Sequence, residues 1–252
     1  MRQGLDFKGR TVLVTGGARG IGREVTRKLG ARGATVVAVG RDAAALQRLR
    51  DEMGHVVGIH ACDLSEPGSA QALADWVLAE HPGTSVLINN AAIMAHTDLT
   101  ADPAGEMDGI KTEIATNLIA PLQLAVALVP VLRRHNRAAV VNVTSGLGIA
   151  PIPDAAVYCA TKAGLRMFTR SFRDQCQRAG LPFQVTEVVM TLVDTTLSRH
   201  GSHRPYPPER AAADLIAGVE RGLDEVWIEK TKLLRVLHRL SPALTYRIMR
   251  GR

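Results

Sequence analysis

Tyr158 and Lys162 combine a weak acid with a cation, and they lie four residues apart in the stretch VYCATKAGL. Residues at positions i and i+4 share one face of an α-helix. A phenol has a pKa of about 10 in water, and a neighbouring ammonium favours its anion, so the pair could exchange a proton with a substrate. The spacing alone is weak evidence, since such a pair arises by chance in this composition with a probability of about 0.07.

A second stretch has the residue types of a phosphate-binding turn. The segment TVLVTGGARGIGREV predicts a buried strand, a turn containing Gly16, Gly20 and Gly22, and a helix that begins at the turn. Glycine allows the positive φ of a tight turn and a close approach of the backbone to a ligand. The N–H groups and the dipole of the helix N-terminus attract a pyrophosphate. In this setting the pattern predicts dinucleotide binding.

Two arginines bear on which dinucleotide is bound. Arg19 lies inside the glycine turn, and Arg41 follows the second predicted strand, where NAD-selective proteins carry an acid. A guanidinium group can bind a 2′-phosphate through two hydrogen bonds. We therefore expect NADP(H) as the cofactor, with NAD(H) less favoured. The alternative interpretation leaves both arginines solvated and makes Asp42 a helix N-cap.

Alternating elements along the chain would position these residues. Apolar runs rich in β-branched residues predict strands at 11–15, 35–39, 56–60, 85–89, 138–144, 183–189 and 225–228. Amphipathic stretches predict helices at 20–32, 43–52, 66–80, 111–135, 155–179 and 208–222. Strands that are apolar throughout are typical of sheets buried on both faces. The sequence predicts a single α/β domain over 1–229, a Rossmann-type, doubly wound, parallel seven-stranded sheet with helices on both faces.

Composition narrows the classes of function. The net charge is +7, but residues 230–252 hold seven basic residues and no acid, so residues 1–229 are formally neutral. The basic character belongs to this C-terminal extension and gives no reason to expect nucleic-acid binding. Three unevenly spaced cysteines indicate a reducing compartment, and no metal-ligand pattern is present. With no signal peptide and no apolar run long enough to cross a bilayer, the protein is expected to be cytoplasmic.

Several motifs, in order and spacing, resemble the short-chain dehydrogenase/reductase family over nearly the full length of the chain. They are TGGARGIG (15–22), CDL (62–64), NNAA (89–92), NLIAP (117–121), Ser145, and Tyr158 with Lys162. TSGLG, VYCATKAGL and the basic extension resemble most closely the DltE-like branch, named after an oxidoreductase of a teichoic-acid D-alanylation operon. The resemblance implies an NADP(H)-dependent oxidoreductase that interconverts a carbonyl (ketone or aldehyde) and an alcohol, and a homodimer or homotetramer.

The resemblance also implies catalytic roles for four residues. Tyr158 would be the general acid for reduction or the base for oxidation, with its pKa lowered by the positive charges of Lys162 and of the oxidised nicotinamide. Lys162 would also hold the nicotinamide ribose. Ser145 would hydrogen-bond the reacting oxygen, and Asn117 would hold a water in a proton relay to Lys162. Each residue has a structural alternative: a turn cap for Ser145, a core aromatic for Tyr158, and a backbone-paired amide for Asn117.

Further contacts with the cofactor are implied in the first half of the chain. Ile21 lies in the glycine turn, Asp63 would contact the adenine amino group, and Leu64 would pack beside the adenine ring. Asn90 and Ala91 would lie near the cofactor, although the Asn90 side chain could only tie strands together.

The segment after the sixth predicted strand departs from the family pattern. Met190-Thr191 stands where the family has Pro-Gly or Pro-Pro, which puts the pose of the cofactor in question. Val193 would face the nicotinamide carboxamide, and Thr195 would be the threonine of the motif. Residues 191–207 lack periodicity and are expected to form a substrate loop that borders a mostly apolar pocket.

Two questions stay open at the level of the sequence. Residues 230–252 could pack within the protein or its oligomer, close over the active site, or lie on an anionic membrane surface; packing is the preferred interpretation. The same dinucleotide cradle would also suit a catalytically idle NADP(H)-binding sensor, although a sensor has no need of the catalytic residues.

Overall fold

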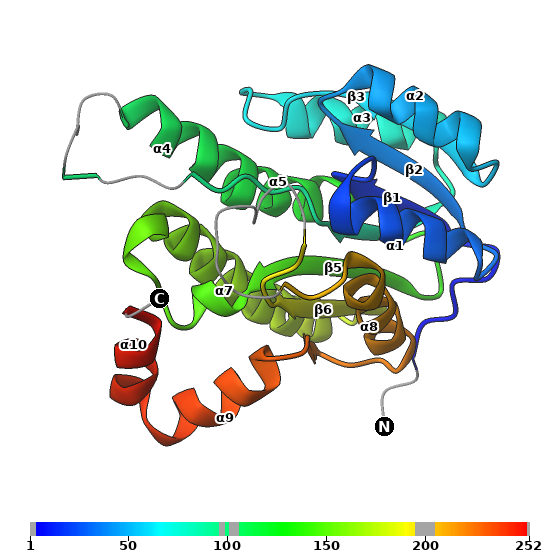
Figure 1. Ribbon diagram of the computed structural model, residues 1–252. Coiled ribbons are helices and arrows are strands. Elements are labelled where there is room, and N and C mark those ends of the chain that lie inside the picture. The colour runs from blue at the N-terminus through cyan, green and yellow to red at the C-terminus, as the bar shows by residue number, and fades with distance from the viewer. Residues whose placement is uncertain (1–3, 96–98, 101–105, 195–204, 251–252) are drawn as a thin grey trace.

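The computed structural model describes residues 4–95, 99–100, 106–194 and 205–250 (Figure 1). In these residues the chain forms one sheet, with helices on both of its faces. The predicted doubly wound α/β fold is therefore confirmed.

The sheet has seven strands, and every neighbouring pair is parallel. The strands are β1 (Thr11–Thr15), β2 (Thr35–Gly40), β3 (Val56–Ala61), β4 (Thr84–Asn89), β5 (Ala138–Ser145), β6 (Phe183–Met190) and β7 (Glu225–Trp227). Their order is β3-β2-β1-β4-β5-β6-β7. The chain order reverses direction at β1, so β1 and β4 flank the point where ligands bind in sheets of this kind.

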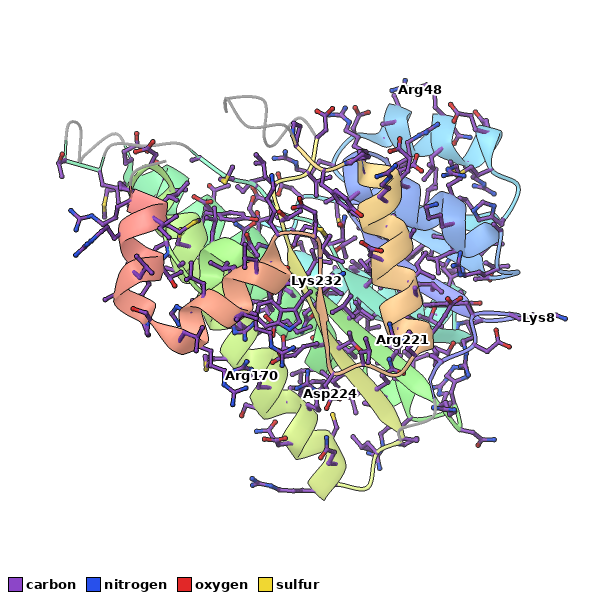
Figure 2. All side chains as sticks on the ribbon, turned by 60° about the horizontal axis from the view of Figure 1, so that its bottom comes forward. Lys8, Arg48, Arg170, Arg221, Asp224 and Lys232 are labelled. Carbon is purple, nitrogen blue, oxygen red and sulfur yellow. The ribbon has the colours of Figure 1, made fainter. Side chains whose placement is uncertain are left out.

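The helices form one layer on each face of the sheet (Figure 1). One layer contains α1 (Gly20–Gly30), α2 (Ala43–Glu52) and α8 (Pro208–Glu220), and the other contains α3 (Ser69–Glu80), α5 (Ala120–Ala127), α6 (Val129–Leu132) and α7 (Ala156–Arg178). Successive strand residues enter opposite layers: Val12 and Val14 pack on the first, and Leu13 packs on the second. Charged side chains such as Lys8 and Arg48 lie on the outside (Figure 2).

The helix predicted at 111–135 is interrupted, which corrects the prediction. α4 (Met107–Ile114) passes into a π-helical turn, Ala115–Ile119, before α5 and α6. Pro130 in α6 has no N–H to continue the hydrogen bonding of α5, so the helix breaks at Leu128. Single π turns inside helices are frequent at functional sites.

The C-terminal extension forms two helices, α9 (Thr231–Leu240) and α10 (Pro242–Arg250), which separate at Ser241, the residue before the proline. Thr231, Thr245 and Met249 are buried. Leu233 and Leu240 are 70% and 78% exposed, so part of the apolar face of the extension stays uncovered by its own chain.

Candidate active site

The glycine turn has the geometry expected of a phosphate cradle. Gly16 and Gly20 have φ angles of +67° and +50°, a region that favours glycine. A Cβ added to Gly22 would lie 2.0 Å from the Gly16 carbonyl oxygen, so no larger residue fits there without opening the turn. Arg19 is the N-cap residue of α1, and its side chain does not cap the helix. The first N–H groups of α1 therefore have no side-chain cap from that residue.

Residues after β4 support this turn. The Asn90 side-chain amide donates a hydrogen bond to the Thr15 carbonyl at 3.0 Å. The backbone N–H groups of Asn90 and Ala91 both donate to the Thr15 hydroxyl, each at 3.0 Å. The Asn90 side chain thus ties strands together, which is the structural alternative considered for it. Ala91 comes close to Gly16, whose added Cβ would lie 3.1 Å from the Ala91 Cα.

Both candidate phosphate-binding arginines are exposed and face acids. Arg19 forms an ion pair with Asp42, and its side chain is 66% exposed. Arg41 lies 3.8 Å from Asp63, with its side chain 64% exposed. Asp42 also accepts a hydrogen bond from the Ala45 N–H at 2.9 Å, so it does cap α2 as the alternative interpretation expected. Surface ion pairs of this kind contribute only about 0–1 kcal/mol, which leaves both guanidinium groups able to bind an incoming phosphate.

Of the residues expected near the adenine and the glycine turn, Asp63 is hydrogen-bonded, whereas Leu64 and Ile21 pack against apolar cores. Asp63 accepts hydrogen bonds from the N–H and the hydroxyl of Ser65, at 2.9 and 2.7 Å. Leu64 is buried in the core layer of α3, and Ile21 packs against the opposite core layer.

The expected catalytic residues come together at the carboxyl end of β5. Ser145 is the last residue of β5, and Tyr158 and Lys162 lie on the first turns of α7. All three are nearly buried, with exposed fractions of 8%, 8% and 2%. Lys162 Nζ lies 5.6 Å from the centre of the Tyr158 ring and donates a hydrogen bond of 3.0 Å to the Val143 carbonyl. The Ser145 hydroxyl accepts from the Leu147 N–H at 3.1 Å, so Ser145 also caps the turn that follows it.

Electrostatics at this site differ from the sequence-based expectation. Burial raises the pKa of Tyr158, and a hydrogen bond with Ser145 offsets only part of that effect. Burial lowers the pKa of Lys162 to about 8, and a nearby carboxylate, Glu113, acts in the opposite direction. In the protein alone, burial outweighs the groups that would lower the pKa of the phenol, and the Lys162 ammonium is directed at the Val143 carbonyl. The phenol stays protonated at neutral pH.

Gly148 lets the turn after Ser145 reach α7. Gly146–Gly148 form a short 3-10 turn, and a Cβ on Gly148 would lie 2.8 Å from the Lys162 carbonyl carbon. The absence of a side chain at this position therefore sets how closely Ser145 and Lys162 approach. On the other side, a Cβ on Gly146 would lie 3.0 Å from Leu234, so α9 packs against the same turn.

Asn117 lies fully buried in the π-helical turn. Its side-chain oxygen accepts a hydrogen bond from the Ile93 N–H at 2.9 Å, and its nitrogen donates to the Ile93 carbonyl at 2.7 Å. The amide is therefore paired with backbone, as the structural alternative held. The nitrogen also lies 3.4 Å from the Thr161 hydroxyl, next to Lys162 in the sequence.

Glu113 was missed by the sequence interpretation. It lies in the last turn of α4, is 2% exposed, and interacts electrostatically with both Lys162 and Tyr158. Burial raises the pKa of Glu113 to about 7. Its sequence context, KTEIATNL, is ordinary for a helix surface, so only the packing of α4 on α7 could have singled it out.

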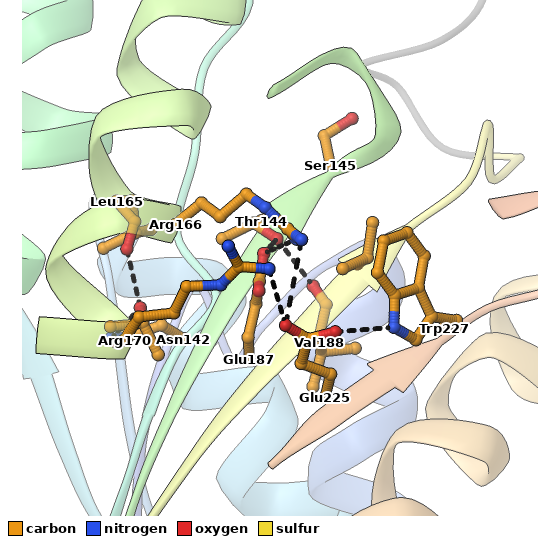
Figure 3. Close-up of polar contacts among 12 residues, drawn as sticks. Asn142, Thr144, Ser145, Leu165, Arg166, Arg170, Glu187, Val188, Glu225 and Trp227 are labelled. Atoms are coloured by element: carbon orange, nitrogen blue, oxygen red, sulfur yellow. Dashed lines mark hydrogen bonds and ion pairs between the residues drawn. The ribbon is translucent and has the colours of Figure 1, made fainter. Parts of the chain in front are cut away.

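A buried ionic network beneath the site was also missed (Figure 3). Glu187 on β6 is fully buried and accepts hydrogen bonds from the Thr144 hydroxyl and from Arg166, both at 2.7 Å. Glu225 on β7 accepts from Arg170 at 2.7 Å and from the Trp227 indole at 3.0 Å. The only sequence signal was spacing: Arg166 and Arg170 continue the i+4 series begun by Tyr158 and Lys162.

The Trp227 ring joins this network to the C-terminal extension. The guanidinium carbons of Arg166 and of Arg235, from α9, each lie 5.1 Å from the centre of the ring. The Thr231 hydroxyl lies 3.2 Å from the Val189 carbonyl and donates to the Ile228 carbonyl at 2.7 Å. The start of α9 is thus attached to the sheet beside α7.

The segment after β6 is only partly described. Met190 ends β6 opposite Ser145, and the Thr191 hydroxyl donates to Glu229 at 3.1 Å. Val193 is 4% exposed and forms an isolated parallel bridge with Tyr206. Thr195 and most of the predicted substrate loop at 191–207 lie outside the described residues.

Among the described residues, no three His, Cys, Asp or Glu side chains form a cluster suited to a metal ion. No helix within those residues is both long and apolar enough to cross a membrane.

Similarity to known proteins covers most of the chain. The family model for short chain dehydrogenase matches residues 10–204. The uncharacterized oxidoreductase DltE of Bacillus subtilis (strain 168) is 32% identical over 231 residues, which cover 89% of this chain and 90% of that protein. This match agrees with the DltE-like branch predicted from the motifs.

Two solved structures share the fold. A short chain dehydrogenase from Burkholderia cenocepacia J2315 in complex with NADP aligns with a TM-score of 0.85 at 23% identity, covering 97% of this chain and 99% of that chain. A metagenomic short-chain oxidoreductase in complex with NADP aligns with a TM-score of 0.72 at 32% identity, covering 89% and 98%.

Proposed function

The chain belongs to the short-chain dehydrogenase/reductase family, and on this premise we propose that it is an NADP(H)-dependent oxidoreductase that interconverts a carbonyl and an alcohol. The observation that carries the proposal is the grouping of Ser145, Tyr158 and Lys162 at the carboxyl end of β5. The carboxyl ends of parallel strands share one edge of the sheet, so this group lies at the same edge as the glycine turn after β1.

The residues present fit a dinucleotide. A Cβ at Gly22 would fill the cradle, and the N-terminus of α1 offers N–H groups to a pyrophosphate. Arg19 and Arg41 would bind the 2′-phosphate, and this contact would replace their surface ion pairs with Asp42 and Asp63. The bound dinucleotide would supply or accept the hydride. Solved relatives crystallised with NADP support this choice of cofactor.

The remaining contacts are proposed from family resemblance together with position. Leu64 and Asp63 would flank the adenine, and Ile21 and Ala91 would line the dinucleotide groove, while Asn90 acts by holding the turn. Val193 and Thr195 stay candidates for the nicotinamide side.

Tyr158 carries the acid–base chemistry in this proposal. Because burial raises the pKa of its phenol, Tyr158 holds its proton at neutral pH and is suited to donate it to a carbonyl oxygen during reduction. The Ser145 hydroxyl would donate a hydrogen bond to the same oxygen as negative charge develops there. Lys162 would orient the nicotinamide ribose. Asn117 contributes by fixing Ile93 after β4 and by its place in the π-helical turn.

The test is NADPH consumption over a panel of ketones and aldehydes, with Tyr158→Phe beside the wild type. We expect the variant to lose turnover and to keep NADPH binding, measured by fluorescence titration. Tyr246→Phe is the matched control, because Tyr246 is 42% exposed on α10. An unchanged rate for Tyr158→Phe would remove Tyr158 from the mechanism. NADPH binding without turnover of any substrate in the wild type would favour the idle sensor.

We also propose a homodimer or homotetramer in the cytoplasm, acting on a small molecule. Val126 on α5 and Met167 on α7 are each 57% exposed and support contact between copies of the chain. Light scattering on Val126→Glu and Met167→Glu tests this: a wild-type oligomer that these variants dissociate agrees with it, and a monomeric wild type contradicts it.

A further inference from the structure

Glu113 is a buried carboxyl group that the proposed mechanism has not used. Glu113 is 2% exposed, and its Oε1 has no hydrogen-bond partner among the described residues. The only hydrogen bond to the carboxyl from the described residues comes from the Ala95 N–H. A buried carboxyl with an unpaired oxygen is costly, by about 1–3 kcal/mol, so its position calls for a role beyond packing.

The surroundings of Glu113 are those of the active site. The titratable groups that interact with it from the described part of the chain are Lys162, Tyr158 and Cys159, all on α7. Among the charged side chains described, Glu113 is the one found to favour the Lys162 ammonium. The hydrogen-bond partner of that ammonium, the Val143 carbonyl, carries no net charge. Glu113 is thus the counter-charge of Lys162.

Burial brings the pKa values of the two groups close together near neutral pH. Burial raises the pKa of Glu113 to about 7, and burial lowers the pKa of Lys162 to about 8. Interacting groups with pKa values this close titrate as a pair, so each holds its proton in dependence on the other. Glu113 also lies about one helical turn before Asn117, on the helix segment that borders Lys162.

We propose that Glu113, a buried carboxyl group on the helix that packs against α7, is a positioning residue that acts through Lys162: it keeps Lys162 in its ammonium form during carbonyl reduction. This inference rests on the proposed function. A purely structural Glu113, which only binds the Ala95 N–H, would affect the rate equally at every pH.

The pH profile of kcat/KM for reduction separates these cases. In Glu113→Gln the anion that favours the ammonium is lost, so Lys162 loses its proton at lower pH, and we expect the alkaline limb of the profile to move down by about one pH unit. Relative to the wild type, activity then falls about tenfold at pH 9 and changes by less than about twofold at pH 6. Asp108→Asn is the matched control, since the Asp108 side chain is 92% exposed on the same helix.

A second measurement does not depend on activity. In protein carrying lysine labelled with 13C at Cε, the titration of Lys162 is followed by NMR and is assigned by the signal that Lys162→Arg removes. We expect Glu113→Gln to lower the titration midpoint of Lys162 by about one pH unit and Asp108→Asn to leave it unchanged. If Glu113→Gln does not fold, Glu113→Asp replaces it, with a smaller movement of the midpoint in the same direction.

The outcomes are distinguishable. An alkaline limb and a Lys162 midpoint that both stay in place in Glu113→Gln would overturn the inference, even if the variant is slower at all pH values. A wild type that reduces no carbonyl would overturn the proposed function, while the NMR titration still decides the coupling between Glu113 and Lys162.

Discussion

Replacing Lys162 by methionine should make the protein more stable while abolishing its turnover. The pKa of Lys162 falls from 10.5 to about 8 because the ammonium is buried. At 1.36 kcal/mol for each pKa unit, holding the charged form inside the protein costs about 3 kcal/mol at neutral pH. The lost hydrogen bond to the Val143 carbonyl subtracts about 1 kcal/mol from the gain. The net expectation for Lys162→Met is about 2 kcal/mol of added stability at pH 7.

The gain should depend on pH in a definite direction. The folded-state pKa of Lys162 lies below its unfolded value, so between pH 8 and pH 10.5 the unfolded chain binds more protons at this residue. In the wild type the contribution of this group to stability is full above pH 10.5 and is lost as the pH falls through about 8. The advantage of Lys162→Met is therefore largest below pH 8 and shrinks towards pH 10.5. The neighbouring Glu113, with a pKa raised to about 7, can take up a proton and does not remain as an unpaired charge.

Urea unfolding of wild type and variant from pH 6 to pH 10 measures this difference. At pH 7 an increase of about 2 kcal/mol corresponds to a rise in Tm of about 4–8 °C for a chain of this size. Lys111→Met is the control, because Lys111 is 74% exposed and its replacement should change stability by less than about 0.5 kcal/mol. A variant less stable than the wild type at pH 7, or a difference that does not change with pH, would refute the reasoning.

Three further changes test other parts of the site. Gly22→Ala places a Cβ 2.0 Å from the Gly16 carbonyl oxygen and should weaken NADPH binding at least about tenfold, or about 1.4 kcal/mol, in a fluorescence titration. Arg41→Ala should raise the KM for NADPH about tenfold and leave that for NADH nearly unchanged, because a charge-assisted hydrogen bond contributes about 1.5–3 kcal/mol; equal effects on both cofactors would contradict its role at the 2′-phosphate. Arg166→Met leaves Glu187 buried without its cation and should lower the free energy of unfolding by about 3–5 kcal/mol, with much of that recovered in Arg166→Met/Glu187→Leu. Burial already raises the pKa of Glu187, so the loss in Arg166→Met should be smaller at pH 5 than at pH 8, as chemical denaturation will check.

Local patterns account for what the sequence predicts well. Most of the strands are runs of apolar, often β-branched residues, and a glycine or proline lies at one end of β1, β2, β4, β5 and β6. The glycine turn is equally local, since Gly16, Gly20 and Gly22 act through backbone geometry within one strand–turn–helix unit. The catalytic grouping was accessible because Ser145 ends a buried strand, and strand ends in a parallel sheet share one edge.

Features that depend on contacts between elements far apart in the sequence could not be predicted from local patterns. The burial of Glu113 follows from the contact of α4 with α7, which no pattern around residue 113 encodes. The pairing of Arg166 with Glu187 joins residues from two elements whose separation along the chain says nothing about the distance between them. The raised pKa of the Tyr158 phenol in the protein alone was not predictable from the sequence, because the degree of desolvation depends on everything packed around the phenol.

The Trp227 ring is in contact with both Arg166 on α7 and Arg235 on α9, so the positions of α7 and of the C-terminal extension depend on each other. α7, which carries Tyr158 and Lys162, contacts one part of the Trp227 ring through Arg166, and α9 contacts the same ring through Arg235. Removing residues 230–252 by truncation or proteolysis should therefore lower turnover, through displacement of Tyr158 and Lys162, under conditions in which the protein as a whole is still folded. Substitutions in the extension would thus be restricted to those that leave the position of α7 unchanged.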